Sequence, residues 1–278
     1  MYRSKRDGYI LECFSNVSEL YNNLKDRKRR PGARTCSEES GSSFAGTSSL
    51  EEAYDLMIHG DKDLCKRINE KAKRLDISKI LGNAIKRNTT YNSVVGYQVN
   101  VPNYLSGIPT DMIANIPTRK SQKIINIIVN ASVSCGISTR DIEKAGSYYY
   151  IVIDLLEKAG YRCNVYSMVS YSHNDKGILL ARVKTDKEPI NREKMAFLLA
   201  HPSFHRRINF KWIECIDCDG DPTRSGYGTP LTDNKSIKTI IDKELKADFI
   251  VWSVQQDYKV SIEKIIENLE KQGIKIGE

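Results

Sequence analysis

The apolar run Ile124-Ile125-Asn126-Ile127-Ile128-Val129 decides the fold prediction. A strand in the middle of a parallel sheet is buried on both faces, so its sequence is almost continuously apolar. After this run the chain carries an amphipathic helical pattern from Ser138 to Gly160, followed by two apolar strand patterns, Tyr161–Tyr171 and Gly177–Lys184. Only five polar residues separate these two strands, which predicts an antiparallel hairpin.

The remaining C-terminal sequence continues to alternate between strand and helix patterns. We expect a helix from Pro189, and then strand, helix, strand and helix over Phe210–Ile216, Ser236–Leu245, Phe249–Val254 and Val260–Gln272. The order β-α-β-β-α-β-α-β-α predicts an α/β domain over residues 123–278, with a mostly parallel, Rossmann-like sheet and helices on both faces.

The first 43 residues are expected to form an arm and a linker outside this domain. Val17, Leu20, Tyr21 and Leu24 recur at helical spacing, which predicts an N-terminal helical arm over residues 1–32. Residues 33–43 are Ser, Gly, Glu and Arg with almost nothing to bury, which predicts a flexible linker.

Residues 44–122 are expected to form a helical and irregular subdomain. A capping box at Ser48-Ser49-Leu50-Glu51 begins one helix, and a charged helix follows from about Asp61 to Leu75. Val95, Tyr97, Val99 and Val101 alternate like a half-buried strand. Residues 103–120 contain two prolines and are expected to wrap over the surface of the next unit.

Composition excludes several classes of protein. The chain has 278 residues, with 43 Lys and Arg against 35 Asp and Glu, a net charge of +8 that suits nucleic acid or an acidic protein as partner without choosing between them. No stretch approaches the roughly 18 apolar residues of a membrane span, and the N-terminus lacks the apolar core of a signal peptide. Seven scattered cysteines suit a reducing compartment. We therefore expect neither secretion nor a membrane partner.

Ligands of open α/β sheets lie beyond the carboxyl ends of the strands, where this sequence places two polar loops. Asn130-Ala131-Ser132-Val133-Ser134 follows the first core strand, and Asp217-Cys218-Asp219-Gly220-Asp221-Pro222 follows the expected fourth. This layout, with a long helix and a hairpin between the loops, resembles the von Willebrand factor A-type fold over about residues 123–273.

That family holds Mg²⁺ through serine hydroxyls, carboxylates and water, and uses the metal to grip an acidic group on a partner protein. The resemblance implies a Mg²⁺ site formed by Asn130, Ser132, Ser134 and Asp219. Asn130 stands where the family has an aspartate, so one negative charge is missing and the resemblance implies a weak or decayed site. No other cofactor is expected.

A second resemblance covers more of the chain. The runs Phe44–Ala53, Asn100–Pro109 and Leu155–Tyr161, and His201-Pro202 followed by Arg206-Arg207, resemble an uncharacterised family of tailed-bacteriophage proteins. This likeness implies a viral origin, with the protein in the host cytoplasm or associated with the virion, and implies no particular chemistry.

Two further sets of residues are weighed as binding sites. His201, His205, Cys215 and Cys218 are four residues of the types that bind zinc, although ordinary reduced cysteines are the favoured interpretation. Lys25, Arg27, Lys28, Arg29 and Arg30 form a basic cluster that suits nucleic-acid phosphates, whereas such clusters at helix ends are more often solvated faces.

The sequence favours a non-catalytic function. It contains no P-loop and no nucleophile elbow, and its four histidines suggest no catalytic triad. The leading hypothesis is a phage-encoded protein that binds other proteins, either a host or defence factor or further copies of itself. The alternative hypothesis is a protein that binds nucleic acid, acting on the viral genome or on host RNA.

Overall fold

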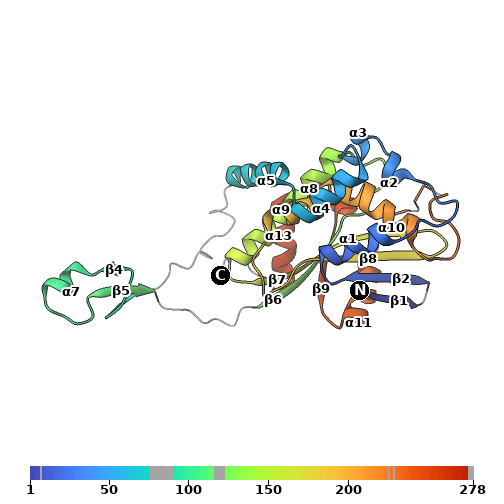
Figure 1. Cartoon of the computed structure of the whole chain (residues 1–278). Helices are drawn as coiled ribbons and strands as arrows, with labels where there is room; N and C mark the ends of the chain where they lie inside the picture. Colours follow the sequence, from blue (N-terminus) through green and yellow to red (C-terminus); the bar gives the residue numbers. More distant parts are fainter. Residues whose placement is uncertain (7, 76–89, 116–122, 225, 228, 275–278) are drawn as a thin grey trace.

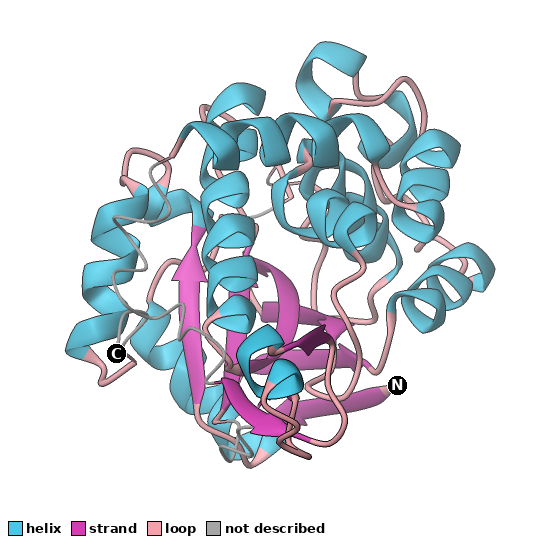
Figure 2. Ribbon diagram, turned by 90° about the vertical axis from the view of Figure 1, so that its left-hand side faces the viewer, coloured by secondary structure: helices cyan, strands magenta, loops and turns pink. Residues whose placement is uncertain are grey.

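The computed structural model describes residues 1–6, 8–75, 90–115, 123–224, 226–227 and 229–274. Its centre is a six-stranded sheet (Figures 1 and 2). In spatial order the strands are β1 (Tyr2–Arg6), β2 (Tyr9–Phe14), β8 (Lys176–Lys184), β7 (Arg162–Ser172), β6 (Ile124–Asn130) and β9 (Phe249–Ser253). We call this sheet and its helices the body.

The strand predicted from the apolar run is the interior strand β6. It pairs in parallel with β7 on one side and β9 on the other, so that Ile127 lies opposite Val165 and Ile250. The β7–β8 hairpin is antiparallel as predicted, β2 is parallel to β8, and β1 is antiparallel to β2. Three of the five pairings are parallel, which confirms a mixed α/β fold with a mainly parallel sheet.

Helices cover the two faces of the sheet unequally. On one face, buried side chains of the sheet pack against α1 (Val17–Asp26), α4 (Leu50–His59), α5 (Lys62–Arg74), α8 (Thr139–Lys158), α9 (Arg192–Ala200), α10 (Phe210–Cys215) and α13 (Ile262–Lys271). On the other face, Leu11, Ile128 and Leu180 pack against α11 (Asn234–Leu245). Figure 2 shows the helices around the sheet.

One glycine sets how closely two of these helices pack. A Cβ atom on Gly146 of α8 would lie 2.1 Å from the carbonyl oxygen of Leu199 on α9. Because only glycine lacks that atom, α8 and α9 approach with their backbones nearly in contact. No helix among the described residues is both long and apolar enough to cross a membrane.

The N-terminus differs from its prediction. Residues 2–6 and 9–14 are not part of a helical arm but form β1 and β2, which extend the main sheet, and α1 packs on that sheet. Residues 33–43 are also not a free linker, because they contain α2 (Cys36–Glu39) and the start of α3 (Ser42–Ala45), and Ser37 is fully buried. The described residues up to Ala45 are therefore an integral part of the body.

The strand predicted over Phe210–Ile216 is instead the helix α10, which continues directly from a π-helical segment, η1 (Phe204–Asn209). The sequence is misleading here because Trp212, Ile213, Glu214 and Cys215 are all buried. A short helix with four consecutive buried residues shows no amphipathic stripe and cannot be told from a buried strand by its pattern. The short helix α12 (Val254–Asp257) follows β9.

Residues 90–115 form a separate small sheet, which we call the lobe. Its strands are β3 (Thr90–Ser93), β4 (Gln98–Val99) and β5 (Met112–Asn115), in the order β3-β5-β4, and the short helix α7 (Val101–Leu105) connects β4 to β5. Figure 1 shows the lobe outside the body. Of the segment predicted to wrap over the body, residues 103–115 lie in the lobe instead, and 116–120 lie outside the described residues.

Candidate functional site

Three of the four predicted Mg²⁺ ligands lie at the carboxyl end of β6, and the side chains of two of them, Asn130 and Ser132, are already bonded to other groups of the protein. The buried Asn130 accepts a hydrogen bond from the Ser132 amide (3.1 Å) and donates one to the Leu231 carbonyl (2.9 Å). The Ser132 hydroxyl accepts a hydrogen bond from the Ser170 amide (2.6 Å) and lies 3.0 Å from the Ser170 hydroxyl. These contacts join β6 to β7 and use the oxygen atoms that a metal would need.

The other two predicted ligands make different contacts. Ser134 is partly exposed, and its amide donates to the Gln255 side chain (2.7 Å). Asp219 follows α10 rather than a strand; its amide donates to Asp175 in the β7–β8 turn and its exposed carboxylate pairs with Lys5 (3.2 Å). The structure therefore brings Asn130 and Ser132 together but places Asp219 at the hairpin turn, in an ion pair of its own.

The zinc hypothesis is wrong for the same kind of reason. His201 lies 3.9 Å from Asp61, His205 contacts Asn209, and Cys215 points to the Arg27 carbonyl. Within the described part of the chain, no three His, Cys, Asp or Glu residues converge as metal ligands would. Burial lowers the pKa of His205 to about 3, so this imidazole is neutral.

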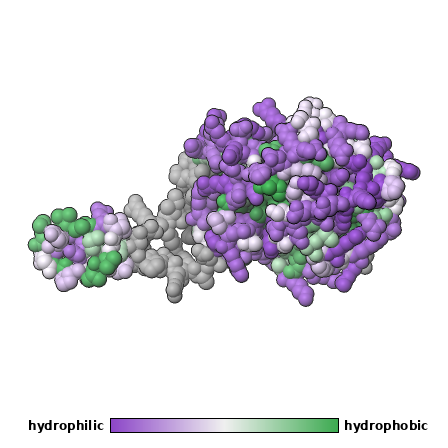
Figure 3. All heavy atoms as spheres, viewed as in Figure 1, coloured by the Kyte–Doolittle hydropathy of each residue, from purple (hydrophilic) through white to green (hydrophobic). Residues whose placement is uncertain are grey.

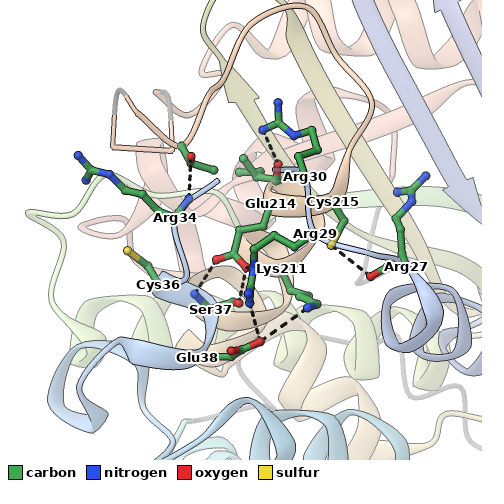
Figure 4. A network of polar contacts seen from close by, with 12 residues as sticks. Arg27, Arg29, Arg30, Arg34, Cys36, Ser37, Glu38, Lys211, Glu214 and Cys215 are labelled. Atoms are coloured by element: carbon green, nitrogen blue, oxygen red, sulfur yellow. Dashed lines mark hydrogen bonds and ion pairs between the residues drawn. The ribbon is translucent and has the colours of Figure 1, made fainter. Parts of the chain in front are cut away.

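The basic cluster faces internal acids rather than an external ligand. Arg29 donates to the buried carboxylate of Glu214 (3.0 Å) and also pairs with the more exposed Glu38. Arg30 donates to the Gly220 carbonyl (2.8 Å) and to Asp221. Figure 4 shows how these arginines turn toward α10 and the loop after it.

A second internal pair uses Arg27, whose guanidinium donates to both carboxylate oxygens of the fully buried Glu12, at 2.8 and 2.9 Å. Of the remaining members, Lys25 lies over the Tyr21 ring and Lys28 is exposed. Three of the five residues predicted to contact phosphates are thus engaged in holding the N-terminal segment on the body.

Apolar exposure is concentrated in the lobe. Nine of the twelve exposed large apolar side chains of the described chain lie there: Tyr91, Val94, Val95, Tyr97, Val99, Val101, Tyr104, Leu105 and Ile108. Leu105 is 78% exposed and Val95 75%. Asp111 is the only charged residue between positions 90 and 115. Figure 3 shows apolar residues across the lobe, while the visible face of the body is mainly polar.

Despite this exposure, the lobe has specific internal contacts. A Cβ atom on Gly96 would lie 2.2 Å from the Ile113 carbonyl oxygen, so the backbone approach at this position requires glycine. The Asn103 side chain donates to the Thr110 carbonyl (2.9 Å), and the Asn100 side chain caps the N-terminus of α7. The prediction of a half-buried strand over Val95–Val101 is wrong, since these apolar side chains are exposed and only Gln98–Val99 is strand.

Comparison with known protein families assigns nearly the whole chain to one family. Residues 5–276 match the model of a family described as a domain of unknown function, DUF7192. The chain belongs to the DUF7192 family. Neither the search of curated proteins nor the search of solved structures gave a match.

The lobe is the feature of this DUF7192 chain that the sequence analysis missed. The run from Val95 to Val101 has the alternating apolar pattern of a half-buried strand, and this pattern alone does not say whether the apolar face has a partner within the chain. Residues 90–115 contain one charged residue, in a protein with 28% charged residues, and this contrast was the sequence signal that set the lobe apart from the body.

The contacts of Asn130 predict what Mg²⁺ and an added charge would do to the DUF7192 chain. We expect Mg²⁺ to leave the Tm unchanged, because the Ser132 hydroxyl is hydrogen-bonded to Ser170 and Asp219 is paired with Lys5. We expect Asn130→Asp to lose about 1–3 kcal/mol of unfolding free energy, because a carboxylate oxygen would replace the amide that donates to Leu231. Thermal melts with MgCl₂, and with KCl at matched ionic strength, test this; a Tm raised by Mg²⁺ alone in either protein contradicts it.

Proposed function

We propose that this chain is a non-catalytic protein that binds another protein chain through its lobe, and that the partner is a second copy of the same chain. The observation that carries the proposal is that no described side chain of the lobe is buried, although the lobe has a defined sheet and nine exposed large apolar residues. Ordering a residue costs about 1–2 kcal/mol, and a small sheet without a buried face does not offset that cost. A covering partner supplies the missing burial.

Charge favours a second copy as that partner. The chain carries +8 overall, so two bodies repel each other. The lobe contains a single charged residue, Asp111, and is therefore a part of the chain where two copies meet without bringing many like charges together. Both β3 and β4 are edge strands of the small sheet, and an unpaired edge strand is a template for pairing with another chain.

The exposed area supports the same partner. A standard protein interface takes roughly 800 Å² from each partner. Three tyrosines that are each about half exposed present roughly 300 Å² of this. The exposed valines, leucine and isoleucine add a comparable apolar area, so the lobe alone approaches the size of a specific interface.

The nucleic-acid hypothesis loses its main support, because Arg27, Arg29 and Arg30 bind internal groups.

The β6–α8–β7–β8 order supports the resemblance to a von Willebrand A-type domain over residues 124–184. The loop that carries Asp219, which this resemblance places after a strand, follows the helix α10 instead. A viral origin, with the protein in the host cytoplasm or on the virion, stays part of this proposal and rests on the sequence resemblance.

A single charge in the lobe tests the proposed self-association. We expect light scattering after gel filtration to give a mass above that of one chain for the natural protein, and the mass of one chain for Leu105→Asp. A buried aspartate carries a desolvation cost of several kcal/mol, enough to lower the affinity at least about a hundredfold.

Thr110→Asp is the matched control, since Thr110 is an exposed polar residue of the same lobe and its replacement adds the same charge without removing an apolar group. We expect Thr110→Asp to behave as the natural protein does. A natural protein that is monomeric at every concentration contradicts self-association. Equal masses for Leu105→Asp and Thr110→Asp exclude the apolar surface of the lobe as the contact.

A further inference from the structure

Two adjacent buried arginines, Arg206 and Arg207, differ in how their charges are satisfied. Arg207 is fully buried, and its five N–H groups donate to five oxygens of residues 37–47, at 2.7 to 3.2 Å. Five is the full donor capacity of a guanidinium. Arg207 is therefore a structural residue whose polar groups all have partners.

Arg206 is 2% exposed but has fewer partners. It donates to the carbonyls of Phe44 (2.8 Å) and Ile137, and its Nε has no hydrogen-bond partner among the described residues. No carboxylate in the described part of the chain forms an ion pair with it, and burial lowers its pKa. A buried cation without an anionic partner is costly and calls for an explanation.

Arg206 also lines a cleft of about 300 Å³ beyond the carboxyl ends of β6 and β7. Parallel α/β sheets bind their ligands at this edge. The other lining groups include the Phe44 and Tyr227 rings, Ser134 and Cys135. Phe44 stacks on the guanidinium, with its ring centroid 4.0 Å from the Arg206 Cζ. The cleft thus combines one cation, aromatic walls and a hydroxyl.

Charge selects the class of ligand. Among the described residues that line the cleft, Arg206 is the only charged one, and His205 beside it is neutral. A phosphate monoester carries about −1.5 to −2 at neutral pH and would require a second cation. A carboxylate carries one charge and matches the planar guanidinium geometrically. The apolar walls suit a ligand with an aromatic or branched aliphatic group.

We propose that this cleft binds a monoanionic carboxylate carried on an aromatic or branched aliphatic group, with Arg206 as its charge partner. The site is independent of the lobe. It would use the N–H groups of Arg206 that have no protein acceptor and would give the buried cation its anion. Ser134, at the rim, would donate the second polar contact.

Cys135 provides a reporter for this site, because it is exposed and lines the cleft. The experiment measures alkylation of Cys135 by N-ethylmaleimide in the full chain, by peptide mass spectrometry, with 3-phenylpropanoate or its uncharged isostere 3-phenylpropanamide present. Only the unliganded fraction reacts, so the carboxylate at about ten times its Kd slows labelling roughly tenfold. The amide should leave the rate unchanged, and the partly exposed Cys218 should label equally in all samples.

In Arg206→Gln, protection by the carboxylate should disappear. The comparison of carboxylate with amide on the natural protein keeps the test decisive if this variant does not fold. Equal protection by both compounds, or protection by neither, overturns the proposal. Stronger protection by phenyl phosphate than by 3-phenylpropanoate overturns the assignment of a monoanionic ligand.

Discussion

Replacing Ile127 with lysine should leave the body unable to fold. Ile127 is fully buried on β6, between Val165 of β7 and Ile250 of β9, and belongs to the apolar core that β6 shares with α8 and α13. An unpaired charge there costs more than about 4–5 kcal/mol, comparable to the whole stability of about 5–15 kcal/mol of a typical domain. Denaturant unfolding followed by circular dichroism measures the effect.

Ile124→Lys is the matched control on the same strand, because Ile124 is 53% exposed at its start. We expect it to change the unfolding free energy by less than about 1 kcal/mol. A cooperative transition of Ile127→Lys at the midpoint of the natural protein would show that β6 is not an interior strand.

Replacing Glu214 with alanine should cost about 3–5 kcal/mol of unfolding free energy. The buried Glu214 carboxylate accepts four hydrogen bonds, from Arg29 Nε, the Ser37 amide and hydroxyl, and the Tyr227 hydroxyl. Burial, together with the bond to Glu214, raises the pKa of Tyr227. Removing the acceptor leaves Arg29 Nε, the Ser37 amide and hydroxyl, and the Tyr227 hydroxyl without the oxygen atoms to which they donate, in the network that fixes residues 29–37 to α10 (Figure 4).

Glu38→Ala provides the comparison within the same network. Glu38 pairs with Arg29 and Lys211, but its side chain is 47% exposed, and exposed ion pairs contribute only about 0.2–1 kcal/mol. Urea unfolding of both variants tests the difference. Equal losses for Glu214→Ala and Glu38→Ala would contradict a structural role for the buried carboxylate.

The sequence predicted the elements whose apolar pattern reflects their own burial. The run Ile124–Val129 identified the interior strand, and the spacing in residues 139–158 identified α8. Each pattern depends only on which faces of the element meet the core. The hairpin β7–β8 followed from the short polar connection between two such strands.

Elements stabilised by distant partners were not predictable in this way. β1 reads Tyr-Arg-Ser-Lys-Arg and lies at the sheet edge, so it has no apolar face to detect. β2 contains the buried Glu12, whose carboxylate pairs with Arg27, just after α1, and accepts a hydrogen bond from Trp212 Nε1. A charged residue inside a short strand argues against burial until its partner is known.

The candidate sites failed for a related reason. Motif spacing predicted that Asp219 would bind Mg²⁺ and that the arginines after α1 would contact phosphates. Spacing does not show that these side chains bind acids, lysines or carbonyl groups of the same chain instead. Arg206 and the lobe show the opposite case, in which partners within the described chain are missing. The Arg206 guanidinium has no anion there, and the apolar surface of the lobe has no cover.

Amide hydrogen exchange at several protein concentrations tests the proposed self-association most directly. The Tyr97 amide donates to the Ile113 carbonyl and the Asn100 amide to the Asp111 carbonyl, so the lobe has hydrogen-bonded amides that report its opening. If a second copy covers the lobe, protection of residues 91–114 should rise with protein concentration, while protection of β6 and α8 stays constant. Protection of the lobe that is the same at every concentration would contradict self-association through this surface.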